Sequence, residues 1–339
     1  MSELNQIALK IISNGKGILA ADESTGTMTK RLDSVNVKST PENRLKFREA
    51  LFSSNGMEKY IGGVILYDET IKQKTSSGLD VVKLISKSGS IPGIKVDTGA
   101  KTLSTSPMEK ITEGLDGLRE RLKEYYEFGA RFTKWRGVYS ISRSLPSKLS
   151  IYSNAHALAR YAALAQEAKM VPIVEPEELM DGEHDAESCY KITSEVLKIC
   201  YEQLYLHNVD LAGTILKPNM ILPGKDCKKK ETGEKIAKMT LQCLENSVPK
   251  EVPGIAFLSG GQTEIEATKN LNLINKNNNT KFIMSFSYGR ALQQSALKYW
   301  GKNQDNIDST QKIFDHRSKM NSLATNAEWT EELENRSEA

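Results

Sequence analysis

Three lysines lie within or at the end of short apolar segments, where a charged side chain is uncommon. They are Lys95 in GIKVD, Lys134 in RFTKWR and Lys217 in GTILKPN. Because burial and cationic neighbours both favour a neutral amine, we expect the pKa of these lysines to fall toward about 7–8. A neutral lysine can attack a carbonyl and form a Schiff base. Each could instead be paired with a carboxylate such as Glu175 or Asp22, and the residue types do not choose among the three lysines.

Two carboxylates could supply the proton transfers that Schiff-base formation requires. Glu175 and Glu177 stand on either side of Pro176, after an apolar run that ends at Val174. On a continuing strand they would face the same way, although Pro176 could bend the chain there. Two neighbouring carboxylates acquire different pKa values, which provides an acid and a base in one site. The alternative is a pair of salt-bridge acceptors for nearby lysines.

Two loops late in the chain have the composition of a phosphate site. Glycine lets backbone N–H groups approach an anion, while serine and arginine add hydrogen-bond donors. The loop residues are Ser259, Gly260 and Gly261, followed by Ser287, Gly289 and Arg290. A further polar cluster near the N-terminus could bind another phosphate or simply begin a solvated helix. It consists of Ser24, Thr27, Lys30 and Arg31.

Composition and spacing exclude several other classes of protein. The 339 residues include 46 basic and 43 acidic side chains, and this balance gives no field to recruit nucleic acid or a membrane. The four cysteines form no CxxC pair and the four histidines no HExxH motif, so we expect no metal site. With few cysteines, no signal-like N-terminus and no apolar run of about 18 residues, the chain is expected to be cytoplasmic, without membrane insertion.

Eight short apolar runs, many of them ending in polar residues, are typical of buried parallel strands. They alternate with helix-like segments, which favours an α/β fold, specifically a single (β/α)8 TIM barrel. Catalytic groups in that fold lie at the carboxyl ends of several strands. The predicted strands cover residues 17–21, 61–66, 94–96, 131–136, 171–174, 213–216, 255–258 and 282–286.

Helix ends are visible between these runs. Thr40 before Pro41 is typical of a helix start, and Gly129 after a leucine stripe is typical of a helix end. We expect the barrel to occupy residues 1–325 as one domain. Residues 326–339, rich in glutamate, are expected to form an acidic flexible tail.

The segments that carry these residues resemble the motifs of class I fructose-1,6-bisphosphate aldolases, the metal-independent type that forms a Schiff base. The resemblance extends from about residue 5 to about residue 325, with the motifs in family order. They are GKGILAADESTG, GGVIL, GIKVDTG, KWRGVY, IVEPE, GTILKPNM, FLSGGQ and FSYGRALQ. The resemblance implies a lyase that reversibly cleaves fructose 1,6-bisphosphate to dihydroxyacetone phosphate and glyceraldehyde 3-phosphate in glycolysis and gluconeogenesis, without a metal cofactor.

The resemblance also implies a role for each residue. Lys217 would be the Schiff-base lysine, Glu175 the proton acceptor, and Glu177 an assistant in proton transfer. Lys134, oriented by Asp22, would help to cleave the bond beside the C4 hydroxyl. The remaining positions would hold substrate: Ser259, Gly260, Gly261, Ser287, Gly289 and Arg290 at the C1 phosphate, Ser24, Arg31 and Lys95 near the C6 phosphate, and Arg136 beside the sugar.

Relatives of this kind are usually homotetramers, which the resemblance implies here too. Two alternatives stay open at this point. The enzyme could act on another phosphorylated sugar, such as sedoheptulose 1,7-bisphosphate or fructose 1-phosphate. The chain could also, or instead, bind actin or an adhesin tail through the basic mouth of the barrel.

One departure from the family pattern predicts a kinetic difference. Eukaryotic relatives usually end in a tyrosine that speeds proton exchange at C3, whereas this sequence has no tyrosine after Tyr299. We expect cleavage to persist and protonation of the enamine to be slow. Tritium exchange at C3 of dihydroxyacetone phosphate measures that step, and a rate typical of the family would refute the expectation.

Overall fold

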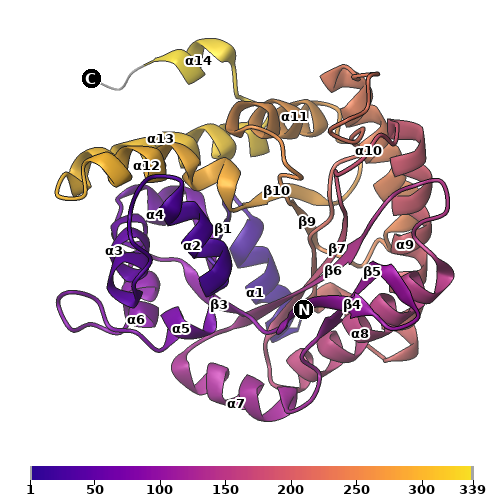
Figure 1. Cartoon of the computed structure of the whole chain (residues 1–339), viewed down its shortest axis with the longest axis horizontal. Coiled ribbons are helices and arrows are strands. Elements are labelled where there is room, and N and C mark those ends of the chain that lie inside the picture. The colour runs from indigo at the N-terminus through magenta and orange to yellow at the C-terminus, as the bar shows by residue number, and fades with distance from the viewer. Residues whose placement is uncertain (1, 337–339) are drawn as a thin grey trace.

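Eight parallel strands close into a barrel in this computed structural model, which describes residues 2–336. The strands pair in the order β1-β10-β9-β8-β7-β6-β3-β2, so each has a parallel neighbour on both sides (Figure 1). Their bounds are β1 Gly17–Ala20, β2 Ile61–Leu66, β3 Ile91–Lys95, β6 Phe132–Tyr139, β7 Val171–Glu178, β8 Ile215–Leu216, β9 Gly254–Phe257 and β10 Ile283–Tyr288.

The predicted (β/α)8 barrel is confirmed, because all eight apolar runs are strands of this sheet. The largest difference in length is in β7, which continues past its predicted end to Glu178, and β6 also continues past its predicted end, to Tyr139. The extension of β7 brings Glu175 and Glu177 to the carboxyl end of the barrel, where the sequence predicts the site.

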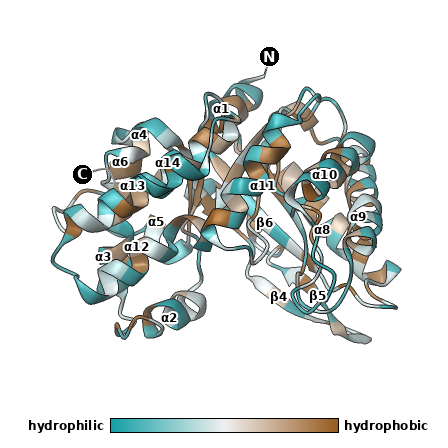
Figure 2. Cartoon of the chain, turned by 90° about the horizontal axis from the view of Figure 1, so that it is seen from above, coloured by the Kyte–Doolittle hydropathy of each residue, from teal (hydrophilic) through white to brown (hydrophobic). Residues whose placement is uncertain are grey.

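Helices follow the strands and surround the barrel (Figure 1). Thr40 caps α3 by accepting a hydrogen bond from the N–H of Asn43 at 3.2 Å, and Gly129 ends α7 with φ 113°, so both predicted helix ends are confirmed. The outer helices carry both hydrophilic and hydrophobic residues (Figure 2). Within residues 2–336, none of the helices has the length and apolar content needed to cross a membrane. Helix bounds are α1 Glu3–Ile12, α2 Thr25–Asp33, α3 Pro41–Phe52, α4 Gly56–Tyr60, α5 Asp68–Ile71, α6 Val81–Lys87, α7 Leu118–Phe128, α8 Lys148–Glu167, α9 Ala186–Leu206, α10 Gly233–Ser247, α11 Glu264–Lys276, α12 Arg290–Lys302 and α13 Ile307–Thr325.

Helix α1 closes the amino-terminal end of the barrel. Ile11 and Ile12 pack in one buried cluster with inward-facing residues such as Phe132. Two glycines allow this close approach: a Cβ on Gly62 would lie 1.8 Å from the carbonyl oxygen of Ile11, and one on Gly254 would lie 1.9 Å from Cδ1 of Ile12. The apolar plug leaves the opposite, carboxyl-terminal end of the barrel for polar chemistry.

An antiparallel hairpin that the sequence analysis did not predict lies between β3 and α7. It consists of β4 (Gly99–Leu103) and β5 (Ser106–Glu113). The Thr112 hydroxyl donates to the carbonyl oxygen of Arg136 at 2.6 Å, and the Thr112 N–H donates to Oδ1 of Asn154 at 3.2 Å. These bonds fix the hairpin to β6 and α8 at the rim of the barrel.

The C-terminal segment contacts the outer helices as far as the structure describes it. Trp329 is 4% exposed; its N–H donates to Oδ1 of Asn272 on α11, and its Nε1 donates to Glu334 at 2.9 Å. Glu334, on α14 (Glu331–Asn335), also pairs with the buried Arg317 of α13. The expected acidic tail thus has defined contacts between Trp329 and Glu334. Its flexibility and the domain boundary at residue 325 stay predictions, and residues 337–339 lie outside the described part.

Replacement of Trp329 by alanine should lower the free energy of unfolding by about 3 kcal/mol, because a large buried side chain would be lost. Urea denaturation checks this. The exposed neighbour Glu328 provides a matched control, and Glu328→Ala should change the stability by less than about 0.5 kcal/mol. Superimposable denaturation curves for Trp329→Ala and wild type would instead indicate an undocked tail.

Candidate active site

The alternation of side chains along β6 and β7 determines which of their residues face the cavity at the carboxyl end of the barrel. On β6, Lys134 and Arg136 face inward above Phe132, and on β7 Glu175 and Glu177 face the same cavity. In the parallel ladder Arg136 pairs with Glu175. Two adjacent strands thus present two cations and two carboxylates to one space.

Pro176 does not interrupt β7, so Glu175 and Glu177 lie on a continuing strand. The N–H of Leu179 donates to β6, whereas the N–H of Glu178 donates to Oδ1 of Asn219 on the β8 side. Pro176 lies two residues before Glu178, so the backbone nitrogens of both residues face β8. Proline has no N–H to donate there, and β8 is only two residues long. The strand therefore tolerates a proline where its neighbour has already ended.

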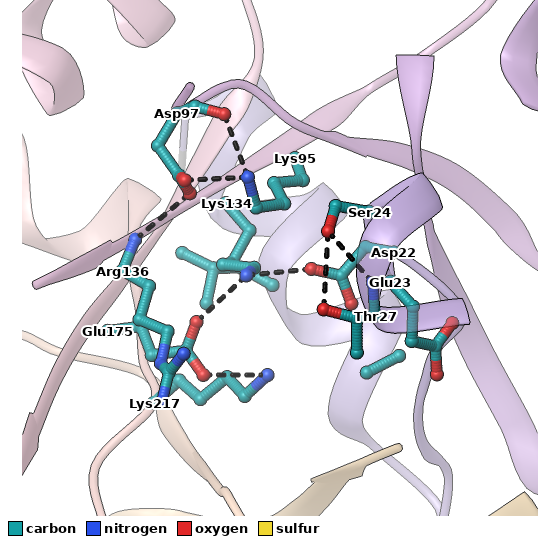
Figure 3. Close-up of polar contacts among 12 residues, drawn as sticks. Asp22, Glu23, Ser24, Thr27, Lys95, Asp97, Lys134, Arg136, Glu175 and Lys217 are labelled. Atoms are coloured by element: carbon teal, nitrogen blue, oxygen red, sulfur yellow. Dashed lines mark hydrogen bonds and ion pairs between the residues drawn. The ribbon is translucent and has the colours of Figure 1, made fainter. Parts of the chain in front are cut away.

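Four charged side chains form an alternating chain through the cavity. The Nζ of Lys134 lies 2.7 Å from Oδ2 of Asp22 and 3.1 Å from Oε2 of Glu175. The other oxygen of Glu175 lies 3.0 Å from the Nζ of Lys217 (Figure 3). Lys134, Glu175 and Lys217 are each less than 5% exposed. A single carboxylate therefore joins the two buried lysines.

The carboxylates reverse the expected effect of burial on Lys134. Burial by itself lowers the pKa of Lys134, but Asp22, Glu175 and Asp97 together raise it above its ordinary value. The prediction of a lowered pKa is therefore wrong for Lys134, which stays a cation. Burial by itself raises the pKa values of Asp22 and Glu175, and the lysines around them hold both below their usual range.

A second pair of ion contacts lies toward the rim. Lys95 Nζ is 2.6 Å from Oδ1 of Asp97, and Arg136 pairs with Glu177 through its Nε. The N–H of Arg136 also reaches Oδ2 of Asp97 at 3.4 Å, which ties β3 to β6. Burial by itself lowers the pKa of Arg136, but Glu177 raises it overall. Arg136 is therefore held as an oriented cation, and the contact with Asp97 fixes the position of Lys95.

One end of the cavity has the geometry of an anion site. Gly260 and Gly261 have φ of 56° and 79°, a backbone conformation that glycine adopts without strain. Ser287 is 1% exposed, and its hydroxyl has no hydrogen-bond partner among the described residues. Arg290 begins α12, whose first turn adds N–H groups and a positive dipole end. These donors suit a phosphate.

Polar groups of α2 lie at the opposite side of the cavity. Ser24 caps this helix, and its hydroxyl lies 3.2 Å from that of Thr27 (Figure 3). Arg31 forms an ion pair of 2.5 Å with Glu23, and Glu23 also meets the buried Arg48 at 3.4 Å. The second predicted phosphate cluster thus has its serine, threonine and arginine at the cavity, whereas Lys30 is exposed and lies outside it.

One cavity of about 490 Å³ is lined by every residue to which the family resemblance gives a role. Two further residues that line the cavity were not predicted to belong to the site. They are Glu23, which directly follows Asp22, and Asp97. The spacing of two between Lys95 and Asp97 was the available signal, since it puts both on one face of a strand. The lining residues proposed beforehand are Asp22, Ser24, Arg31, Lys95, Lys134, Arg136, Glu175, Glu177, Lys217, Ser259, Gly260, Gly261, Ser287, Gly289 and Arg290.

Comparison with known proteins decides the family. The family model of class-I fructose-bisphosphate aldolases matches residues 3–339. The chain belongs to this family. It is 49% identical over 330 residues to a probable class 1 fructose-bisphosphate aldolase of Xanthomonas campestris, covering 97% of this chain and 99% of that protein. It is 52% identical over 324 residues to cytosolic fructose-bisphosphate aldolase 4 of Arabidopsis thaliana, covering 95% and 82%.

A solved structure agrees with the sequence comparison. The aldolase of Plasmodium falciparum, crystallised with TRAP and a small-molecule inhibitor, superposes with a TM-score of 0.95 at 45% identity, covering 97% of this chain and 95% of that one. The chain is therefore a class I aldolase, a lyase that reversibly cleaves fructose 1,6-bisphosphate. Within residues 2–336 no group of three or more His, Cys, Asp or Glu is arranged to hold a metal ion.

Replacement of Lys134 by methionine should lower the free energy of unfolding at pH 7 by about 3 kcal/mol, because Asp22 and Glu175 would lose the cation between them. The double variant with Asp22→Asn should recover part of this loss, since one of the two carboxylates is then neutral. Urea denaturation of the wild type, both single variants and the double variant gives the coupling energy. Strictly additive effects would contradict the shared ion pair.

Proposed function

We propose that Lys217 is the nucleophile of this aldolase and acts through a Schiff base, without a metal cofactor. The observation that carries the proposal is the 3.0 Å contact between Lys217 Nζ and Glu175, at the centre of a cavity with phosphate-suited groups at both ends. Lys134 is the other buried lysine in contact with Glu175, but two carboxylates hold it as a cation. A fixed cation is a poor nucleophile, which favours Lys217.

The reaction then follows from the charges around the substrate. The neutral amine of Lys217 adds to the C2 ketone, and Glu175 and Glu177 transfer the protons that release water and leave an iminium. The iminium accepts the electron pair of the C3–C4 bond as Glu175 accepts the proton of the C4 hydroxyl. Lys134, oriented by Asp22, stabilises the developing negative charge on that oxygen.

The products leave in two steps. Glyceraldehyde 3-phosphate departs first, the enamine is protonated at C3, and hydrolysis of the new iminium releases dihydroxyacetone phosphate and restores Lys217. Ser259, Gly260, Gly261, Ser287, Gly289 and Arg290 would hold the C1 phosphate through this sequence. Ser24, Arg31 and Lys95 would hold the C6 phosphate, and Arg136 the sugar between them. The two anchors keep the open chain in position over the amine.

Borohydride reduction in the presence of dihydroxyacetone phosphate should trap an adduct on Lys217, with or without EDTA. Digestion and mass spectrometry locate the adduct, and Lys217→Arg serves as the control that should give none. An adduct on Lys134 or Lys95 would keep the chemistry but overturn the assignment. An adduct that EDTA abolishes would contradict the metal-independent mechanism.

We also propose a cytoplasmic homotetramer whose basic mouth can hold an acidic partner segment. The Arabidopsis relative is named cytosolic, and the Plasmodium relative was crystallised with TRAP. An adhesin tail or actin would compete with fructose 1,6-bisphosphate if it occupies the mouth, so a competition binding assay tests that part. Light scattering of the purified protein tests the tetramer.

A further inference from the structure

Glu178 lies on the active-site strand β7 but points away from the cavity. Successive residues of a strand face opposite sides, so Glu177 lines the cavity while Glu178 faces the layer between the barrel and its helices. The side chain of Glu178 is fully buried. Its neighbour across the ladder is Tyr139 of β6. Two consecutive glutamates therefore lie in different surroundings.

The surroundings of Glu178 contain acids and neutral groups. Within residues 2–336, neither carboxylate oxygen has a hydrogen-bond partner. The N–H of Glu178 itself and the hydroxyl of Thr193 lie near enough to lower the pKa of this carboxyl, although neither meets hydrogen-bond geometry. The groups around Glu178 are Tyr139 of β6, Glu177 of β7, Cys189, Thr193 and Cys200 of α9, Asn219 after β8, and Cys243 of α10.

In the described part of the chain, helices α8 and α1, which also pack on β7, place no cation at this position. Tyr161 of α8 bonds to Thr133 and to the carbonyl oxygen of Ile173, farther down the strand. Helix α1 packs against Val171 and Ile173 at the amino-terminal end. An ionised Glu178 would therefore be a buried charge without a compensating cation, which is costly.

The carboxyl of Glu178 is accordingly neutral at neutral pH. Burial raises the pKa of Glu178 to about 8, and the nearby Glu177 adds to this effect. Burial, with a contribution from Glu178, also raises the pKa values of Cys189 and Cys200 to about 12. The hydroxyl of Tyr139, which has no hydrogen-bond partner in the described part of the chain, faces the same layer as Glu178.

Glu178 is joined through its backbone to the segment that carries Lys217. Its N–H donates to Oδ1 of Asn219 at 3.1 Å, two residues beyond Lys217. Asn219 in turn donates to the carbonyl oxygen of Met220 at 3.0 Å. A shift of Glu178 would therefore move Glu177 directly and loosen the hold on the segment after Lys217.

We propose that Glu178 is a positioning residue whose neutral form fixes the carboxyl end of β7 against Asn219. It thereby holds Glu175 and Glu177 in place beside Lys217, and its ionisation displaces that end of the strand and lowers turnover. The proposal rests on the roles given above to Lys217 and Glu175. It makes the active-site strand itself sensitive to alkaline pH.

The thermal test compares the wild type with Glu178→Gln, which is neutral at every pH. The carboxyl of Glu178 titrates near 4.5 when unfolded and near 8 when folded. Between these values the folded chain keeps a proton that the unfolded chain releases, so Glu178 makes the wild type less stable as pH rises. The melting temperature of Glu178→Gln should therefore match that of the wild type near pH 4.5, exceed it increasingly up to about pH 8, and keep that margin above pH 8.

A matched control separates this effect from the loss of any glutamate. Glu127 is exposed on α7, and Glu127→Gln should melt with the wild type at every pH. A melting difference for Glu178→Gln that stays constant with pH would overturn the proposal. If the variant does not fold, infrared spectra of the unaltered protein replace it: a protonated carboxyl band should vanish between pH 6 and 9, and its absence at pH 6 overturns the proposal.

The kinetic test uses the pH profile of cleavage, which a purely structural role would not change. The wild-type kcat should fall above about pH 8, while Glu178→Gln should retain its kcat there and stay within twofold of the wild type at pH 7. The same alkaline limb in both proteins would overturn the positioning role. Borohydride trapping in the unaltered protein tests the Schiff-base assignment separately. If no adduct forms on Lys217, both that assignment and the positioning role of Glu178 are refuted. The pH-dependent melting difference would still stand, because it does not depend on the reaction.

Discussion

Two protonated amines are costly to hold side by side in a buried cavity unless carboxylates separate them, and this condition governs the site. Glu175 offers one oxygen to Lys134 and the other to Lys217, and Asp22 closes the far side of Lys134. Each charge alone would be costly at this depth. In this alternating arrangement the carboxylates keep Lys134 charged, and they leave Lys217 as the lysine with a single carboxylate contact.

The alternating charges require four strands in fixed register. Asp22 follows β1, Lys134 lies on β6, Glu175 lies on β7 and Lys217 follows β8. A closed parallel barrel meets this requirement, because every strand is held on both sides and all carboxyl ends meet at one rim. The apolar plug at the other end, where α1 packs through Gly62 and Gly254, provides the burial that makes the ion pairs strong.

Sequence predicted the strands well because buried parallel strands leave a local signal, a short apolar run. It predicted the site residues as a set because a barrel brings its strand ends together, although their roles stay predictions. Predictions from the sequence were wrong or incomplete where the outcome depends on residues that are distant in the chain. The state of Lys134 depends on two carboxylates far away in the chain, and the extension of β7 through Pro176 depends on the shortness of β8. The hairpin β4–β5 was missed because exposed polar residues interrupt both strands, so they leave no apolar run in the sequence.

Glu177 and Glu178 show that residue type alone does not determine ionisation. Glu177 meets the guanidinium of Arg136, so its negative charge is compensated within the cavity. The side chain of Glu178, one residue later, is buried near thiols and hydroxyls, and burial raises its pKa to about 8. The direction in which each side chain leaves the strand decides which of the two is charged. One strand can thus present a carboxylate paired with a guanidinium to the cavity and a neutral carboxyl to the packing layer. The position of the carboxyl end of β7 is therefore coupled to the protonation of Glu178.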